Sequence, residues 1–132
     1  MIFGIGTDIV HVERIQRSLA RFGDAFARRI LSDTEFDEFV QNPRPASYLA
    51  KRFAAKEAMS KALGTGFRDG LSLRHIGVTH DAHGRPGLRC AGKADELLQA
   101  LGIDACHLSL ADERDYAIAF VTLEKASRTA DI

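Results

Sequence analysis

The sequence predicts an α+β protein, a single small domain over residues 1–126 followed by a polar C-terminal tail over residues 127–132. Apolar residues recur every three or four positions in several stretches, which is typical of amphipathic helices. In other stretches apolar and small polar residues alternate, which is typical of strands. Glycines, prolines and capping residues separate these stretches. By length the 132 residues form one domain, large enough for a real hydrophobic core.

Composition and charge exclude several classes of protein. Lys and Arg together number 18, as do Asp and Glu, and a net charge of zero argues against bulk nucleic-acid binding. No apolar run approaches a membrane span, and the first residues lack the basic region of a signal peptide. Cys90 and Cys106 have no metal-ligand spacing and are interpreted as reduced core residues. We therefore expect a soluble, cytoplasmic protein.

Residues 2–10 are predicted to form the first strand. Gly4, Gly6 and Asp8 alternate with larger side chains, so they share one face of this strand. The two glycines permit close approach of a ligand or of another strand. Asp8 either extends from this bare face toward a ligand or caps the following helix.

The next stretch, residues 12–22, has apolar residues at helical spacing and ends at Gly23. Its other side carries Arg14, Arg17 and Arg21, which form a stripe of one sign on a neutral protein. The stripe is either an ordinary solvated face or a surface that docks an acidic partner.

Two shorter helices follow. One is predicted over residues 24–31, and Ser32 and Glu35 form a capping box that begins the other. This second helix stops before Pro43, because prolines cannot continue it.

The central helix is predicted to start near Ser47 and to end at Gly64 as a left-handed cap. Glu57 and Lys61 lie one turn apart on one side of it. Alanines at every fourth position give a smooth neighbouring face that another element can approach closely: Ala50, Ala54, Ala58 and Ala62.

Lys61 is followed by the loop of Gly64, Thr65 and Gly66. An ammonium group beside glycine-rich amides suits phosphate oxygens, because both offer positive charge without bulk. The alternative interpretation is a surface pair between Glu57 and Lys61 at the end of an amphipathic helix.

The second half of the chain is predicted to hold a hairpin, a helix and two long strands. His107 and Ser109 share the polar face of one of these strands. His107 is therefore a candidate general base or substrate ligand, or a hydrogen-bonded structural residue. The predicted elements are strands 76–80 and 88–90 around a turn, helix 92–101, and strands 105–112 and 116–124.

Asp8 and Glu57 are candidates to share a hard cation. Mg²⁺ prefers oxygen ligands and keeps several waters, so two carboxylates and substrate phosphates suffice. With Lys61 nearby, the expected reaction is attack on a phosphorus atom of a pyrophosphate.

Three separated motifs resemble the holo-[acyl-carrier-protein] synthases, the small group of 4′-phosphopantetheinyl transferases. They are Gly4-Ile-Gly6-Thr-Asp8-Ile, the run from Arg52 through Lys56-Glu57 and Lys61 to Gly64-Thr-Gly66, and His107-Leu-Ser109. The resemblance implies Mg²⁺-dependent transfer of the 4′-phosphopantetheine arm of coenzyme A to a serine of apo acyl carrier protein, a step in fatty acid biosynthesis. It also implies the fold of that family, a mostly antiparallel sheet packed with helices, and a homotrimer with active sites between subunits.

The resemblance assigns roles to particular residues. Asp8 and Glu57 would hold Mg²⁺, and Lys61 would contact phosphate or the leaving group. The arginine stripe would grip the acidic carrier protein. The residues expected near coenzyme A are Arg52, Lys61, Gly64, Thr65, Gly66, Pro86, His107 and Ser109.

One position departs from the family pattern. Many relatives carry a second His five residues after the first, where this chain has Asp112. A His at that position therefore cannot be the base here, and Glu57, a metal-bound water or His107 would accept the serine proton. Asp112 could also simply cap the turn.

Two other functions remain open from sequence. One is a non-catalytic module that clamps acidic carrier proteins through the arginine stripe. The other is a small metal-dependent nuclease, which the zero net charge and the lack of interleaved basic and aromatic residues disfavour.

Overall fold

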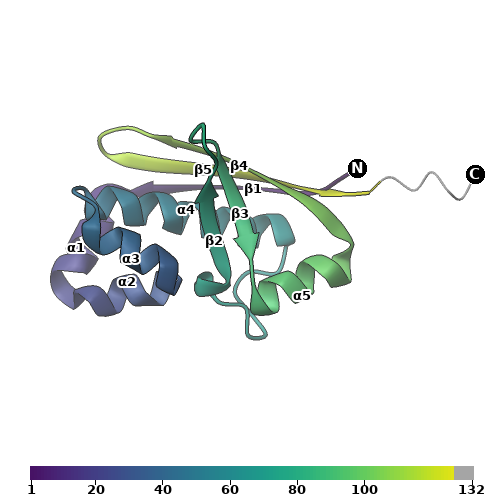
Figure 1. Cartoon of the computed structure of the whole chain (residues 1–132), viewed down its shortest axis with the longest axis horizontal. Coiled ribbons are helices and arrows are strands. Elements are labelled where there is room, and N and C mark those ends of the chain that lie inside the picture. The colour runs from purple at the N-terminus through teal and green to yellow at the C-terminus, as the bar shows by residue number, and fades with distance from the viewer. Residues whose placement is uncertain (127–132) are drawn as a thin grey trace, which may run out of the picture.

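The computed structural model describes residues 1–126 and contains two antiparallel sheets with helices packed beneath and beside them (Figure 1). The predicted tail, 127–132, lies outside the described residues. The larger sheet has three strands in the order β1 (Ile2–His11), β5 (Tyr116–Lys125) and β4 (Ile103–Asp112). A hairpin of β2 (Ile76–His80) and β3 (Pro86–Cys90) forms the second sheet. The predicted α+β class is confirmed.

The helices match the predicted stretches closely. They are α1 (Val12–Phe22), α2 (Asp24–Ile30), α3 (Asp33–Gln41), α4 (Pro45–Leu63), a short 3₁₀ helix η1 (Leu73–His75) and α5 (Gly92–Leu101). The start of α4 differs from the prediction: it begins at Pro45 and not near Ser47. Proline is favoured in the first turn of a helix, where its missing N–H leaves no bond unmade. Gly64 ends α4 in the left-handed conformation, as predicted.

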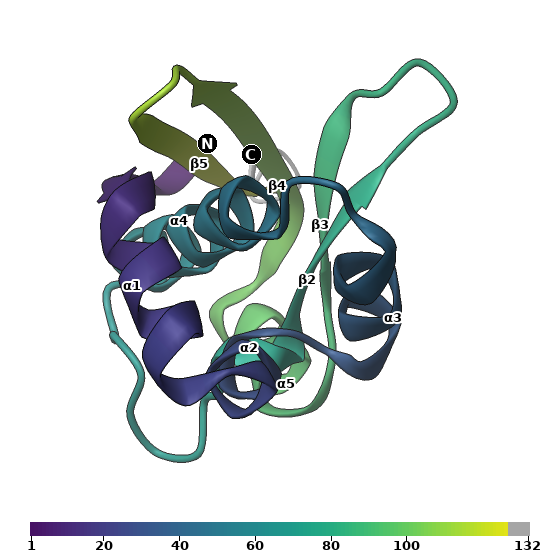
Figure 2. The same ribbon diagram turned by 90° about the vertical axis from the view of Figure 1, so that its left-hand side faces the viewer.

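Helix α4 lies directly against β1, beneath the three-stranded sheet (Figures 1 and 2). A Cβ atom added to Gly4 would overlap the carbonyl oxygen of Ala62, and one added to Gly6 would overlap that of Ala58. The close approach expected from the glycines and from the alanine row therefore occurs between β1 and α4. The partner of the glycines is this helix, and not another strand or a ligand.

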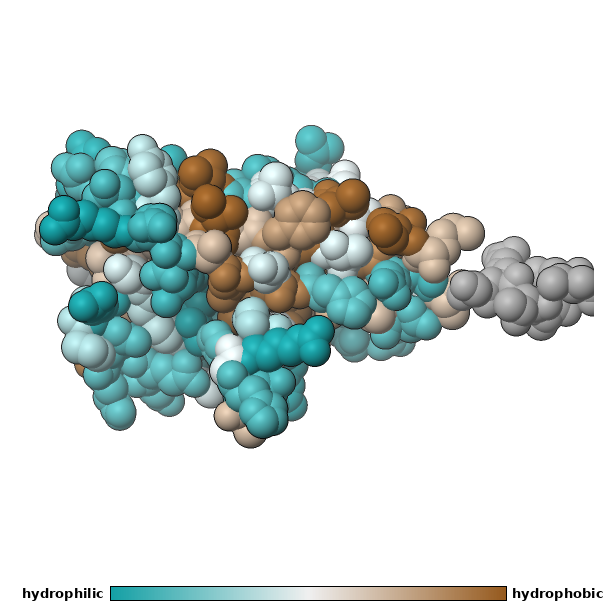
Figure 3. Space-filling model, turned by 90° about the horizontal axis from the view of Figure 1, so that it is seen from above, coloured by the Kyte–Doolittle hydropathy of each residue, from teal (hydrophilic) through white to brown (hydrophobic). Residues whose placement is uncertain are grey.

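The two faces of the three-stranded sheet differ in burial. The inner face is completely buried at Ala117, Ala119, Val121 and Leu123 of the central strand β5. The outer face exposes five large side chains: Ile5, Ile9, Tyr116, Ile118 and Phe120. Figure 3 looks onto the molecule from this side and shows brown, hydrophobic groups among teal ones. We call these five residues the outer apolar face.

Within residues 1–126, no helix combines the length and the apolar character needed to cross a bilayer. Cys90 and Cys106 are free thiols that pack partly buried against the core, as expected.

Candidate active site

An acidic and a basic side chain meet where β1 crosses α4. Asp8 follows Gly6 on the inner face of β1, so its carboxylate points toward the helix. The Lys61 ammonium donates to Asp8 Oδ1 at 3.0 Å and to the backbone carbonyl of Thr7 at 3.0 Å. The structure therefore shows a long-range pair between Lys61 and Asp8, in place of the surface pair between Glu57 and Lys61 that was the alternative interpretation.

Glu57 lies one turn before Lys61 on α4 and is half-buried. Its pKa is raised above the ordinary value, first by burial and next by the negative charge of Asp8. Lys61 and Arg14 oppose this rise. Asp8 and Glu57 therefore lie close enough for their charges to interact, and a cation between them would relieve their repulsion.

Asp8 pairs with Lys61 and does not cap helix α1. The cap of α1 is His11, and no side chain bonds to the helix at that end. Residues 1–126 contain no group of three or more His, Cys, Asp or Glu side chains able to hold a metal. Two carboxylates still fit Mg²⁺, because this ion retains water and takes further oxygens from substrate phosphates.

The loop after α4 carries the backbone conformation that its glycines allow. Gly64 and Gly66 both have positive φ angles, of 80° and 64°. The hydroxyl of Thr65 donates to the carbonyl of Gly66 at 3.0 Å. The loop thus turns sharply just beyond Lys61, on the same end of α4.

Arg52 and Pro86 line a small cavity of about 220 Å³ between α4 and the hairpin. We call it the Arg52–Pro86 cavity. Lys51 and Asp112 also line it, with Lys51 Nζ 3.9 Å from Asp112 Oδ2. The other lining residues are His80, Gly84 and Leu110.

His107 and Ser109 lie on the outer face of the sheet. In the β-ladders, His107 pairs with Thr122 and Thr122 with Ile5, whereas Asp8 pairs with Ala119 of the buried inner face. His107 Nε2 lies 3.4 Å from Glu124 Oε1. Within one chain, His107 and Asp8 are therefore on opposite faces of one sheet.

The predicted site residues thus fall into separate groups in one chain. Asp8, Glu57 and Lys61 come together at the crossing of β1 and α4, with the glycine loop beyond them. Arg52 and Pro86 come together at the Arg52–Pro86 cavity. His107 and Ser109 lie together on the outer face of the sheet. A single chain does not unite all three groups.

The arginine stripe is exposed along α1, as predicted for Arg14, Arg17 and Arg21. Arg14 lies near enough to Glu57 to lower its pKa. The stripe therefore begins beside Asp8 and Glu57, which we call the acidic pair, and leads away from them. At its far end the guanidinium of Arg21 sits 5.1 Å from the ring centre of Phe22.

Sequence reasoning missed a buried charge network around Arg52. Glu35, Arg52 and Lys56 are each at least 95% buried, and they connect α3 to α4. Lys56 donates to Glu35 Oε1 and to the Ile30 carbonyl, both at 2.6 Å. The capping box identified Glu35 only as a local bonding partner of Ser32, so no sequence signal revealed the network.

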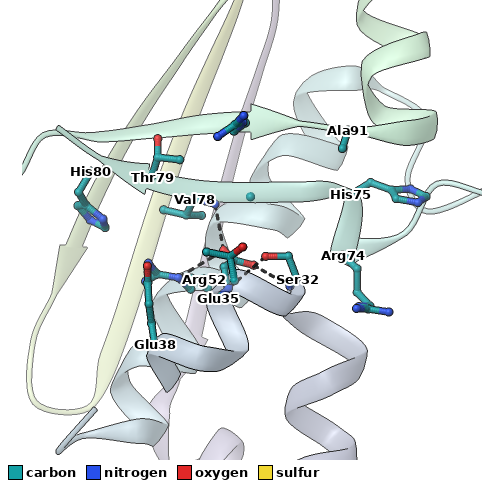
Figure 4. A pocket seen from close by; sticks show the side chains of 13 residues that line it. Ser32, Glu35, Glu38, Arg52, Arg74, His75, Val78, Thr79, His80 and Ala91 are labelled. Carbon is teal, nitrogen blue, oxygen red and sulfur yellow. Dashed lines mark hydrogen bonds and ion pairs between the residues drawn. The ribbon is translucent and has the colours of Figure 1, made fainter. Parts of the chain in front are cut away.

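A larger pocket, of about 590 Å³, opens between α3 and the hairpin (Figure 4). Arg52 and His80 line both this pocket and the Arg52–Pro86 cavity. Arg52 and His80 are therefore shared by the linings of the two hollows.

Comparison with known proteins identifies the family. The model of the 4′-phosphopantetheinyl transferase superfamily matches residues 4–121. A holo-[acyl-carrier-protein] synthase of Halorhodospira halophila is 57% identical over 123 residues, which are 93% of this chain and 98% of the relative.

Solved structures of similar proteins indicate the same family. The holo-[acyl-carrier-protein] synthase of Neisseria meningitidis has a TM-score of 0.90 and 51% identity, and the match covers 95% of this chain and all of that one. The Bacillus anthracis synthase, solved in complex with CoA (3′,5′-ADP), has a TM-score of 0.79 and 36% identity over 96% of this chain and 99% of its own. Because the family model matches residues 4–121, most of this chain, the chain belongs to the 4′-phosphopantetheinyl transferase superfamily.

Proposed function

We propose that this protein transfers the 4′-phosphopantetheine arm of coenzyme A to a serine of apo acyl carrier protein, as a holo-[acyl-carrier-protein] synthase. The observation that carries the proposal is the meeting of Asp8 with Lys61 and Glu57 at the crossing of β1 and α4. The names of relatives up to 57% identical and the solved complex of a relative with CoA support the same substrates.

The reaction is a displacement at phosphorus. The serine oxygen bonds to the phosphorus that bears the pantetheine arm, and the bond from that phosphorus to the bridging oxygen breaks. The departing adenosine 3′,5′-bisphosphate takes the electron pair. The serine proton goes to a base, for which Glu57 and His107 are the candidates among the chain's own residues. Lys61 neutralises charge that develops on the phosphate oxygens.

Asp8 and Glu57 would hold Mg²⁺. Burial and the negative charge of Asp8 raise the pKa of Glu57, and a bound cation would offset the repulsion between the two carboxylates. When bound, the ion supplies neutralisation of the coenzyme A diphosphate.

Arg52 and Pro86 would bind the nucleotide part of coenzyme A in their shared cavity. Its walls carry Lys51 and Arg52 against the single carboxylate of Asp112, which favours an anionic guest. His107 and Ser109 would contact coenzyme A from the sheet, and Gly64, Thr65 and Gly66 from the loop after α4.

We further infer a homotrimer with active sites between subunits. Two observations support an assembly: the site residues are separated within one chain, and the outer apolar face is exposed in it. Packing copies through this face would bury it and would bring His107 of one copy toward the acidic pair of another.

The arginine stripe would dock the carrier protein. Arg14, Arg17 and Arg21 offer positive charge to an acidic partner and lead to the acidic pair, where the serine must arrive. We place this activity in the cytoplasm and in fatty acid biosynthesis.

The experiment incubates the purified protein with coenzyme A, Mg²⁺ and an apo acyl carrier protein, and measures the carrier by mass spectrometry. The expected result is a mass gain of one phosphopantetheine arm that requires Mg²⁺. Salt-sensitive binding of the carrier without any mass gain would instead favour the non-catalytic module.

A further inference from the structure

Arg52 is held by carboxylates on one side only. Arg52 Nη2 donates to Glu38 Oε2 at 3.2 Å, and Nε lies 3.3 Å from Glu35 Oε2 (Figure 4). Both glutamates belong to α3 and line the larger pocket, whereas neither lines the Arg52–Pro86 cavity. The carboxylates that contact Arg52 therefore come from α3, and Arg52 itself also lines the Arg52–Pro86 cavity.

The plane of the guanidinium is also fixed. It lies 3.9 Å from the ring centre of Tyr48, one turn earlier on α4. The Tyr48 hydroxyl donates to Glu38 Oε2 at 2.8 Å. Glu38 thus holds both the ring and the cation stacked on it, which restricts the rotamers of Arg52.

Glu35 is in turn held by four groups. Besides its contact with Arg52, it accepts bonds from Lys56 Nζ at 2.6 Å and from the backbone N–H groups of Ser32 and Val78, both at 3.0 Å. Lys56 is completely buried and pairs with Glu35, which leaves Glu38 as the carboxylate that pairs with Arg52. Only Glu38 among the carboxylates that touch Arg52 is exposed, with 55% of its side chain accessible.

We propose that Glu35 and Glu38 are positioning residues that fix the Arg52 guanidinium as an anion-binding group facing the Arg52–Pro86 cavity, and so strengthen coenzyme A binding. This inference rests on the proposed function, because it takes the anion to be a phosphate of coenzyme A. Holding a flexible arginine in its bound geometry before the ligand arrives removes an ordering cost from binding.

The test uses Glu38, because removing the buried Glu35 would leave Lys56 without its partner and could unfold the protein. Glu38→Ala is expected to weaken coenzyme A binding about tenfold, measured by calorimetry on the full chain with Mg²⁺. The KM for coenzyme A should rise similarly, while the KM for the carrier and the melting temperature change little. Asp37→Ala, a neighbouring exposed carboxylate on α3, is the matched control and should bind coenzyme A like the parent.

A double-mutant cycle separates positioning from a merely structural role. If Glu38 acts through Arg52, Glu38→Ala should cause no further loss of affinity in the Arg52→Ala background. The same full loss in both backgrounds would overturn the proposal, as would unchanged affinity of the single variant. If Arg52→Ala binds too weakly to measure, Arg52→Lys supplies the cycle, since lysine keeps the charge without the fork. Absence of coenzyme A binding by the parent protein would instead refute the proposed function.

Discussion

At the scale of single residues, the carboxyl group of Glu57 is the most informative group in the molecule. It is half-buried beside Asp8, and both burial and the Asp8 charge raise its pKa. The ionised form of Glu57 therefore costs the folded protein more free energy than an unperturbed carboxylate would. Carboxylates with raised pKa values are common at functional sites, which supports the role proposed for Glu57.

Replacing Glu57 by Gln tests this cost. The raised pKa means that the folded state loses stability as the pH rises from the ordinary value of 4.5 through the elevated one. In a metal-free buffer, Glu57→Gln should therefore unfold at a higher temperature than the parent at pH 7. The difference should shrink on acidification and vanish below pH 4.5. A variant less stable than the parent at pH 7 would contradict this account.

Residue patterns predicted some contacts and missed others for a clear reason. Ser32 and Glu35 form both predicted capping-box bonds, at 3.3 and 3.0 Å, because the two residues are three apart in the chain. The bond from Val78 to Glu35 joins residues 43 apart, and the bond from Lys61 to Asp8 joins residues 53 apart. Local spacing carries no information about partners at such separations.

At the scale of elements, the crossing of β1 and α4 determines where the acidic pair forms. Gly6 leaves no room for a Cβ atom, since the Ala58 carbonyl oxygen occupies that position. The alanine row and the glycines each predicted a close approach, but neither pattern could name its partner. The structure shows that the two patterns meet each other.

Gly6→Ala should therefore destabilise the protein by about 3 kcal/mol, because backbone must move to admit a methyl group. Denaturant unfolding measures this change. Gly87→Ala is the matched control: its Cβ would meet only the side chain of Thr79, at 3.3 Å, and a cost below about 1 kcal/mol is expected. Equal costs for the two substitutions would show that the crossing is looser than described.

Helix α1 offers a second test at this scale. Arg17→Glu with Arg21→Glu should raise the KM for the carrier at least tenfold and leave the KM for coenzyme A within about twofold. Arg14 is left unchanged because it also acts on Glu57. Lys93→Glu on α5, which lies at the other end of the molecule in Figure 1, is the control for a charge reversal away from the stripe. Equal changes in the two KM values would contradict a role of the arginine stripe in docking the carrier protein.

At the scale of the whole molecule, the outer apolar face has no partner within residues 1–126. Its residues alternate along β1 and β5 with buried ones, so sequence patterning predicted strands but not what covers this face. Ile9 is 61% exposed and Phe120 46% exposed. A monomeric protein rarely leaves such a surface to water.

Phe120→Asp should therefore shift the protein from an oligomer to a monomer in light scattering and lower turnover with it. The expected mass of the parent is that of three chains. Val40→Asp changes an apolar residue on α3 that is at least as exposed as Phe120, and it should leave the mass unaltered. A monomeric parent with full activity would refute the shared active site.

The central claim is that Asp8 and Glu57 jointly hold the divalent cation on which transfer depends. Carrier modification followed by mass spectrometry, across a Mg²⁺ series, tests it most directly with Asp8→Asn and Glu57→Gln. Each variant should lose at least a hundredfold in rate at every Mg²⁺ concentration, while Glu113→Gln, an exposed residue in the β4–β5 turn, keeps the parent rate. Rates close to the parent in either acidic-pair variant would contradict the account.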